Sequence, residues 1–243
     1  MACLSIAALG AACSDDSDEP TGAGGSGGAP VTTSATIAST TATNTTSSTS
    51  STGAGGAPDG WAVAFGDGLA AGADQVVVDS ADDIVVSGIF SGTIVLGETS
   101  ITSISDGADA FIAKLDPDGA GLWALQLGTT SGYTRVELAI GPDDDIVVAG
   151  GFNGAFSLGG TDFDAGAFAD VFAARWNRDG ELLWVQHFVC EEDAFVSGVA
   201  VDDAGNIVFG GQFSGTCDFG DFDLTAAIGD GYVVALGPEI GRA

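Results

Sequence analysis

From residue 60 onward the chain is built of short apolar runs separated by acidic and glycine-rich turns. The run Gln75–Asp79 is followed by an acidic turn and a second run, Ile84–Ile89. A third run covers Asp109–Leu115, and a fourth covers Trp123–Leu127. Runs of this length, rich in Val and Ile and bounded by Asp, Gly and Pro, predict β-strands. The region shows no convincing 3.6-residue apolar period, so no helix is predicted.

This order of runs occurs three times. The tryptophans that mark it are spaced by 62 and 61 residues: Trp61, Trp123 and Trp184. Three glycine-rich segments align without a gap: Ile84–Gly97, Ile146–Gly159 and Ile207–Gly220. A further block follows each of them: Asp109–Trp123, Asp170–Trp184 and Asp230–Gly241. The pattern predicts an all-β fold, a β-propeller-like array of three four-stranded repeats of about 61 residues. The excursion Thr93–Ser105 explains the long period and is predicted to be a small hairpin.

The two ends of the array are unequal. An orphan Trp strand, Trp61–Phe65, precedes the first repeat, and the third repeat lacks its own Trp strand. We therefore expect Trp61–Phe65 to pair beside Tyr232–Leu236, in the third blade of the same chain or of a second copy. A homodimer would close a six-bladed propeller in this way. The alternative is a fragment of a longer propeller protein.

Charge excludes several functions. Asp and Glu number 34 against 5 Lys and Arg, which gives a formal charge of −29. Such a chain has no electrostatic attraction for nucleic acid or for an anionic membrane surface. The single histidine, His187, excludes a His-rich metal site, and no G-x-S-x-G motif accompanies it. No catalytic residue and no cofactor are predicted. The rival hypothesis is an enzyme that uses acidic residues at the mouth of the propeller.

The N-terminus predicts export. Residues 1–13 form a short apolar run that ends in LGAAC. Its length suits the apolar region of a signal peptide and is too short to span a bilayer. The ending resembles a bacterial lipobox, so Cys13 is the predicted lipid acceptor. Gly10 stands where a lipobox usually has Leu, and no basic residue precedes the run. The alternative is an apolar tail with a chance cysteine.

Residues 14–59 predict a linker. Of the 21 residues from Thr32 to Thr52, 16 are Ser or Thr, and Gly and Pro are frequent around them. A segment with no apolar period cannot offset the entropy of ordering its backbone, so we expect a disordered tether. The predicted domains are therefore 1–13, 14–59 and 60–243, the last being the propeller.

Paired carboxylates are frequent in the repeats. Most precede a strand, where Asp satisfies backbone groups of a turn. Calcium is the alternative, because hard cations prefer several oxygen ligands. The weak calcium candidates lie in two turns: Asp116, Asp118, Asn177 and Asp179. These turns lack a later acidic ligand and contain Pro or Arg, so no metal site is predicted.

Two cysteines lie in the repeats. Cys190 and Cys217 both fall in the third copy and close to predicted strand ends. Outside the cytoplasm such a pair predicts a disulfide, and the alternative is two small buried thiols. The repeated tryptophans are predicted to pack one blade on the next rather than to stack on sugars.

The motif D-x-F-(V/I)-A-K-L-D-x-x-G-x-x-x-W, best preserved in Asp109–Trp123, resembles the bacterial SBBP-type β-propeller repeat. The resemblance covers about Gly60–Gly241 and extends to myxobacterial surface lipoproteins. Later copies depart from it, since Lys114 becomes Arg175 and then Ala235. The resemblance implies a propeller fold and an exported, cell-envelope location, but no ligand. We therefore expect a noncatalytic, lipid-anchored binding or structural module at the outer membrane or cell surface, which reaches the membrane only through its lipid anchor and binds an unidentified envelope or extracellular ligand.

Overall fold

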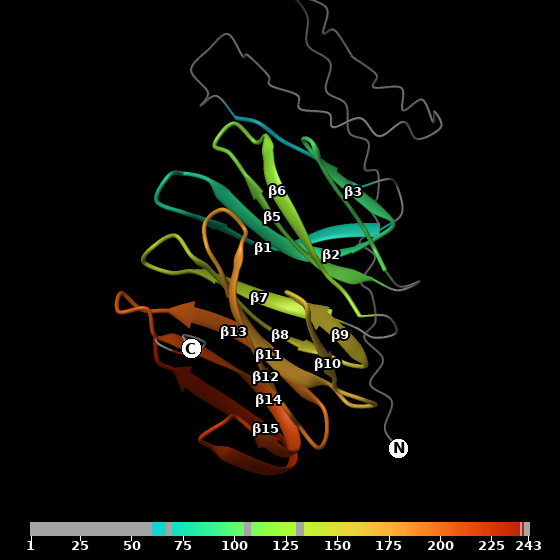
Figure 1. Cartoon of the computed structure of the whole chain (residues 1–243), viewed down its shortest axis with the longest axis vertical. Helices are drawn as coiled ribbons and strands as arrows, with labels where there is room; N and C mark the ends of the chain where they lie inside the picture. The colour runs from blue at the N-terminus through green and yellow to red at the C-terminus, as the bar shows by residue number, and fades with distance from the viewer. Residues whose placement is uncertain (1–59, 67–69, 105–107, 130–133, 239, 241–243) are drawn as a thin grey trace, which may run out of the picture. The chain divides into compact units, whose positions relative to one another are not determined.

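The computed structural model describes residues 60–66, 70–104, 108–129, 134–238 and 240 (Figure 1). They belong to a unit that the contacts delimit as Thr41–Ala243. The predicted signal segment, Cys13 and the linker up to residue 59 lie outside them. The elements of the described part are all strands. Among these residues there is no helix long and apolar enough to cross a membrane.

The first sheet, called blade 1, has four antiparallel strands in the order β1-β2-β5-β6. Its strands are β1 (Ala70–Val78), β2 (Ile84–Ser91), β5 (Asp109–Leu115) and β6 (Gly121–Leu127). The predicted excursion is a separate hairpin of β3 (Thr93–Leu96) and β4 (Thr99–Thr102). The strand number and the hairpin predicted for this repeat are therefore confirmed.

Blade 2 repeats this plan in the order β7-β8-β11-β12. Its strands are β7 (Thr134–Ile140), β8 (Ile146–Phe152), β11 (Asp170–Trp176) and β12 (Leu182–Phe188), and its hairpin is β9 (Ala155–Leu158) with β10 (Thr161–Asp164). Cross-strand partners are equivalent in the two blades. Lys114 lies opposite Trp123 in blade 1, and Arg175 lies opposite Trp184 in blade 2. The alignment of the repeats therefore holds at the level of sheet register.

Blade 3 differs in having three strands among the described residues. They are β13 (Ala194–Val201), β14 (Ile207–Asp218) and β15 (Asp223–Leu236), in that order. The two long strands keep pairing through the region that forms a separate hairpin in the other blades, down to Asp218 opposite Asp223. The outer edge of β15 is the place that β6 and β12 occupy in their blades.

The blades stack face to face (Figure 1). The inner strands converge, because β7 contacts both β1 and β13. One apolar core lies between blades 1 and 2, where Ile112 and Leu127 meet Phe152 and Phe172. A second core lies between blades 2 and 3 and includes Trp184 and Phe209. A third core lies on the front of blade 1, where Phe65 packs with Phe90 and Phe111. The result is an all-β, propeller-like array with an apolar core between each pair of adjacent blades.

The predicted closure within one chain is wrong. Trp61–Phe65 lies on blade 1, far along the array from blade 3 (Figure 1). The indole Nε1 of Trp61 donates a 2.8 Å hydrogen bond to the carbonyl of Pro117, and the Phe65 ring meets the Phe111 ring edge-on. The segment has no strand assignment. Phe65 packs on the apolar face of blade 1, which is closer to it along the chain than β15 is. Local packing therefore determines the position of Trp61–Phe65.

The same glycine recurs in the second strand of every blade for a steric reason. A Cβ at Gly88 or Gly211 would lie 1.9 or 1.8 Å from a carbonyl oxygen of the inner strand, that of Gly72 or Phe195. Such a contact is far inside van der Waals distance. The inner strands therefore approach so closely only because these positions lack a side chain.

We expect Gly211→Ala to lower the free energy of unfolding by about 1–3 kcal/mol, because the new methyl group must push β13 away from β14. Urea unfolding monitored by tryptophan fluorescence measures the loss. The matched control is Gly198→Ala on β13, where a Cβ meets no atom within 4 Å. Equal stabilities of the two variants would contradict the explanation.

Candidate functional site

A hollow with a volume of about 480 Å³ lies between blades 2 and 3. Its lining combines two charged, one aromatic and two further polar side chains: Arg135, Asp193, Phe195, Asn153 and Ser197. Arg135 and Phe195 occupy equivalent positions on the inner strands of blades 2 and 3. Each directly follows the residue that pairs with the repeated phenylalanine of its blade, Phe152 or Phe213. The first repeat has Gly72 at this position. The lining is therefore not a repeated feature of the blades.

A buried carboxyl lies beside this pocket on the same strand. Glu137 is 8% exposed and accepts a hydrogen bond from the side chain of Gln75, its equivalent in the first repeat. The Gln75 Oε1 accepts from the Leu138 amide at 2.6 Å. Burial raises the pKa of Glu137, the Arg135 charge opposes this, and the Asp74 charge adds to it. The pair joins the inner strands of blades 1 and 2.

At the opposite ends of these strands a buried cation bridges the turn of blade 1. The Lys114 Nζ lies 2.7 Å from Asp79 Oδ2 and 3.1 Å from Asp83 Oδ2. It also donates a 3.3 Å hydrogen bond to the carbonyl of Arg178 in the next blade. The side chains of Lys114 and Asp79 are 2% and 0% exposed. This cation therefore holds one turn together and touches its neighbour.

In blade 2 different residues form the equivalent buried ion pair. Arg175 takes the place of Lys114, and its Nη2 lies 2.7 Å from Asp145 Oδ2. Gly141 takes the place of Asp79, and a Cβ there would lie 3.5 Å from that guanidinium. The larger cation thus fills space that a carboxylate fills in blade 1. In blade 3 the cation is replaced by Ala235, which is exposed.

The acidic turns bear out the interpretation of their carboxylates as turn-forming groups. Asp82 and Asp144 have φ values of 64° and 59°, and Gly205 stands at the same place in blade 3 with 81°. Asp144 accepts two hydrogen bonds from Ser80 of blade 1, one from the hydroxyl at 2.6 Å and one from the amide at 2.9 Å. These bonds, the hydroxyl first, lower the pKa of Asp144. The turns therefore also link neighbouring blades.

The weak calcium candidates serve two further turns. Asp116 Oδ1 accepts from the amides of Asp118 and Ala120 at 3.0 and 2.8 Å. Asn177 Oδ1 accepts in the same way from the amides of Asp179 and Glu181 at 3.1 and 2.9 Å. The structure does not bring the two turns together around a common point. Within the described ranges, no three His, Cys, Asp or Glu side chains are grouped as metal ligands.

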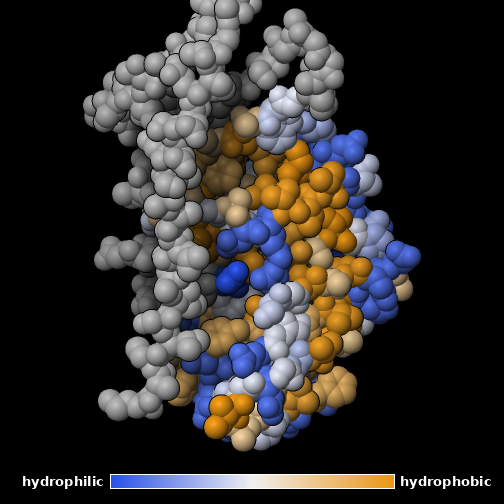
Figure 2. Space-filling model, turned by 180° about the vertical axis from the view of Figure 1, so that it is seen from behind, coloured by the Kyte–Doolittle hydropathy of each residue, from blue (hydrophilic) through white to orange (hydrophobic). Residues whose placement is uncertain are grey.

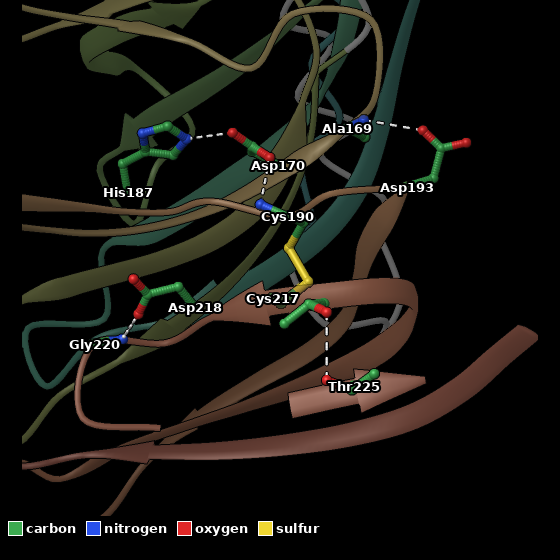
Figure 3. Close-up of a disulfide and its surroundings, with 10 residues drawn as sticks. Ala169, Asp170, His187, Cys190, Asp193, Cys217, Asp218, Gly220 and Thr225 are labelled. Carbon is green, nitrogen blue, oxygen red and sulfur yellow. Dashed lines mark hydrogen bonds and ion pairs between the residues drawn. A yellow bond between two sulfur atoms is a disulfide. The ribbon is translucent and has the colours of Figure 1, made fainter. Parts of the chain in front are cut away.

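His187 pairs with a carboxylate that sequence reasoning did not assign to it. Its Nε2 lies 2.6 Å from Asp170 Oδ2 (Figure 3). Its ring also contacts Phe152 and Phe163. In blade 1, Gln126 stands at the position of His187 and donates at 2.5 Å to Asp109, the equivalent of Asp170. Gln126 cannot titrate, yet it makes the same contact. The repeat thus indicates that this contact is structural in both blades.

Cys190 and Cys217 form a disulfide with a Cα–Cα distance of 4.1 Å (Figure 3). Cys190 follows β12 of blade 2, whereas Cys217 lies on β14 of blade 3. The Cys190 amide donates to Asp170 Oδ1 at 2.8 Å. The bridge therefore connects two blades, where the sequence suggested a link inside one blade region.

Sequence reasoning missed the paired ions and the pocket. The repeat alignment contained a signal for the ions, because the exchange of Lys114 for Arg175 accompanies the exchange of Asp79 for Gly141. For the pocket it contained no such signal, because the repeat spacing aligns Arg135 with Ala73 and Val196. The register shifts in β1 and β13, which β7 lacks, bring Arg135 and Phe195 to equivalent positions.

Two four-stranded sheets and one three-stranded sheet, stacked with converging inner strands, give the described residues a β-propeller-like repeat fold. Comparison with known proteins agrees at this level. The chain is 29% identical over 102 residues to an uncharacterized WD repeat-containing protein of Acanthamoeba polyphaga mimivirus. The match covers 39% of this chain and 7% of the length of that protein. No family model matches the chain.

Proposed function

We propose that this protein is a noncatalytic binding module tethered to the cell envelope through a lipid on Cys13. The fold is of a kind that serves as a binding or structural module, and it fixes no chemistry by itself. The binding role is therefore inferred from the lining of the pocket, and the location is inferred from the N-terminal sequence.

The observation that carries the binding role is the contrast between repeated and unrepeated polar residues. The buried polar residues that recur from blade to blade hold turns or strand ends. They are the equivalent cations Lys114 and Arg175 and the equivalent carboxylates Asp109 and Asp170. The pocket between blades 2 and 3 has a lining that does not recur. Arg135 offers it a cation and Phe195, which is 46% exposed, offers a ring. Asp193 adds a carboxylate to the same lining, and its Oδ1 accepts from the Ala169 amide at 2.9 Å. A lining with both a cation and a carboxylate beside a ring suits a small ligand that carries charged groups of both signs and a flat apolar face.

The location rests on the sequence before residue 60. An apolar run that ends at Cys13 suits export and acylation, and the Ser/Thr-rich segment that follows suits a spacer. Because one acyl chain binds a membrane only marginally, stable anchoring requires the several chains that bacterial lipoproteins carry. The chain as a whole has a formal charge of −29, and its repeats are strongly acidic, so the folded domain has no attraction for an anionic bilayer.

The test compares the native sequence with Cys13→Ala, both expressed with a complete signal peptide. We expect the native protein to partition into the detergent phase and into the membrane fraction of the cells. The variant is expected in the aqueous phase, because it keeps every residue of the blades and loses only the acyl acceptor. Protease added to intact cells reports exposure at the surface. Cys3→Ala is the matched control and should partition like the native protein; aqueous partitioning of all three would refute the tether.

A further inference from the structure

One face of blade 3 is uncovered in the described part of the array. In blades 1 and 2 the third strand, β5 or β11, is buried at every residue. Blades 1 and 3 cover the two sides of β11, whereas β5 is covered by blade 2 on one side and by Phe65 and the hairpin β3-β4 on the other. In β15 the residues alternate between buried and exposed. Val233 is 73% exposed, whereas its equivalents Ile112 and Ala173 are 0% exposed. The back face of blade 3, defined by Val208, Val233 and Ala235, is thus an interblade surface without a neighbour.

The back face of blade 3 has apolar residues at the positions that a neighbouring blade covers in blades 1 and 2. Val208 corresponds to Val85 and Val147, which are both 0% exposed, yet it is itself 38% exposed. Ala235 removes the cation that blades 1 and 2 hold at this position. Apart from this end face, Figure 2 shows apolar side chains at the surface along one side of the stacked sheets. A face of β-branched residues without a charge is suited to burial by another sheet.

The front of blade 1 presents the complementary situation. Trp61 donates to a turn carbonyl and covers Gly119, just as Trp123 donates to the carbonyl of Arg178 and covers Gly180. The segment Trp61–Phe65 therefore lies where the outer strand of a preceding blade would lie.

Among the described residues, no other strand of such a preceding blade lies in front of blade 1. Val76 and Val78 on the inner strand are 60% and 56% exposed, while Leu138, the equivalent of Val76 in blade 2, is 4% exposed. The front of blade 1 thus has an outer-strand segment in place and an uncovered inner strand. In blade 3 the described residues form the three inner strands β13, β14 and β15, and none of them pairs with the outer edge of β15.

The pairing inside blade 1 predicts how the two surfaces fit. There Ala110 lies opposite Leu127, Ile112 opposite Leu125 and Lys114 opposite Trp123. Carried to equivalent positions, this register sets β15 against Trp61–Phe65 with three opposed pairs: Gly231 with Phe65, Val233 with Val63, and Ala235 with Trp61. Val233 and Val63 are both apolar, and Ala235 leaves room for the indole.

We propose that blade 3 docks on the front of blade 1 of a second copy, whose Trp61–Phe65 segment becomes the fourth strand of blade 3. The contact gives hydrogen-bond partners to the free edge of β15 and covers Val76, Val208 and Val233. It repeats the geometry by which blade 1 packs on blade 2. It also goes beyond the proposed function, since it depends neither on the lipid nor on the ligand pocket.

Cysteine pairs test the register directly. All proteins carry Cys3→Ser and Cys13→Ser, so that only the introduced thiols are free. A protein with Val63→Cys is mixed with one carrying Val233→Cys and is oxidised. We expect a covalent dimer that contains one chain of each kind, because the two residues face each other across copies. The matched control replaces Val233→Cys by Ile228→Cys, which is 88% exposed on the same strand but outside the shared register. Equal cross-linking of Val63→Cys with both partners overturns the proposal.

Sedimentation of the full-length protein provides the second measurement. We expect dimers or longer assemblies, and we expect Val233→Arg to weaken association by about thirtyfold, because a charge is placed in the centre of the contact. Ile228→Arg should leave association unchanged. Thermal unfolding of dilute Val233→Arg should match that of the native protein, since Val233 is exposed in one copy. A native protein that stays monomeric, or an assembly that Val233→Arg leaves intact, overturns the proposal.

Discussion

Lys114→Met is expected to lower the free energy of unfolding by about 3–5 kcal/mol, because it leaves a buried charge behind. The change removes the cation that lies 2.7 Å from Asp79 and 3.1 Å from Asp83. The Asp79 side chain is fully buried, so its charge is left without a partner or has to be neutralised. Met keeps the length and most of the apolar stem of Lys, so packing is largely retained. Urea unfolding at neutral pH measures the loss.

Arg178→Ala is the matched control for that variant. Its guanidinium is 48% exposed and lies 3.9 Å from Asp144 Oδ2, and its backbone carbonyl, which accepts from Lys114, is kept. An exposed pair of this kind contributes less than about 1 kcal/mol. If the two variants lost similar amounts of stability, the buried cation would not have the role assigned to it.

The ion pair of Lys114 and Asp79 also makes the loss of stability in Lys114→Met depend on pH. Burial acts to raise the pKa of Asp79, but hydrogen bonds from Lys114 and from the amides of Ala81 and Asp83, together with the Lys114 charge, outweigh it and lower the pKa. A lowered pKa contributes stability above the unfolded pKa of about 4, and this stability is lost as the pH falls through the folded value. In the variant, burial is no longer opposed by the cation. The difference in stability should therefore narrow as the pH falls from the pKa of Asp79 in the variant to the lower pKa that Asp79 has in the native protein.

Cys190→Ala combined with Cys217→Ala is expected to cost about 3.5 kcal/mol in the chain-entropy model, for a loop that spans 27 residues. Because the bridge connects the end of blade 2 to the middle of blade 3, its loss should uncouple these blades. We expect the unfolding transition of the double variant to broaden as well as to shift. Urea unfolding with and without dithiothreitol measures both effects.

The reductant provides the control for the disulfide. Native protein treated with dithiothreitol should unfold like the double variant, which should itself be insensitive to the reagent. Titration of thiols in unfolded protein should yield two more after reduction than before it. No increase on reduction would contradict the bridge.

The strands were predictable because they recur. Ile84, Ile146 and Ile207 mark the second strand of each blade at nearly constant spacing, and the structure keeps them in register with Leu115, Trp176 and Leu236. Local composition decides such elements, so each copy of the repeat adds evidence for the others.

Contacts between distant residues were harder to predict. Lys114 and Asp79 are 35 residues apart and meet only because of the register between strands. Asp170 and His187 meet in the same way across one hairpin. The position of Trp61–Phe65 was predicted wrongly within the chain, because the sequence shows that this segment is an outer strand but not which blade it joins. The pocket depends on the spacing of two inner strands, a quantity that no run of residues encodes.

The disulfide has a mechanical consequence for a chain pulled from its N-terminal side against a load on blade 3. Tension would pass from Cys190 to Cys217 through the sulfur atoms, and the strand β13 between them would carry none of it. While the disulfide is intact, the 27 residue steps of this loop add no contour length when the blades separate. The oxidised protein therefore extends about 90 Å less than the reduced protein. Rupture in a force experiment would therefore begin at blade 1, and the reduced protein would extend further by this length.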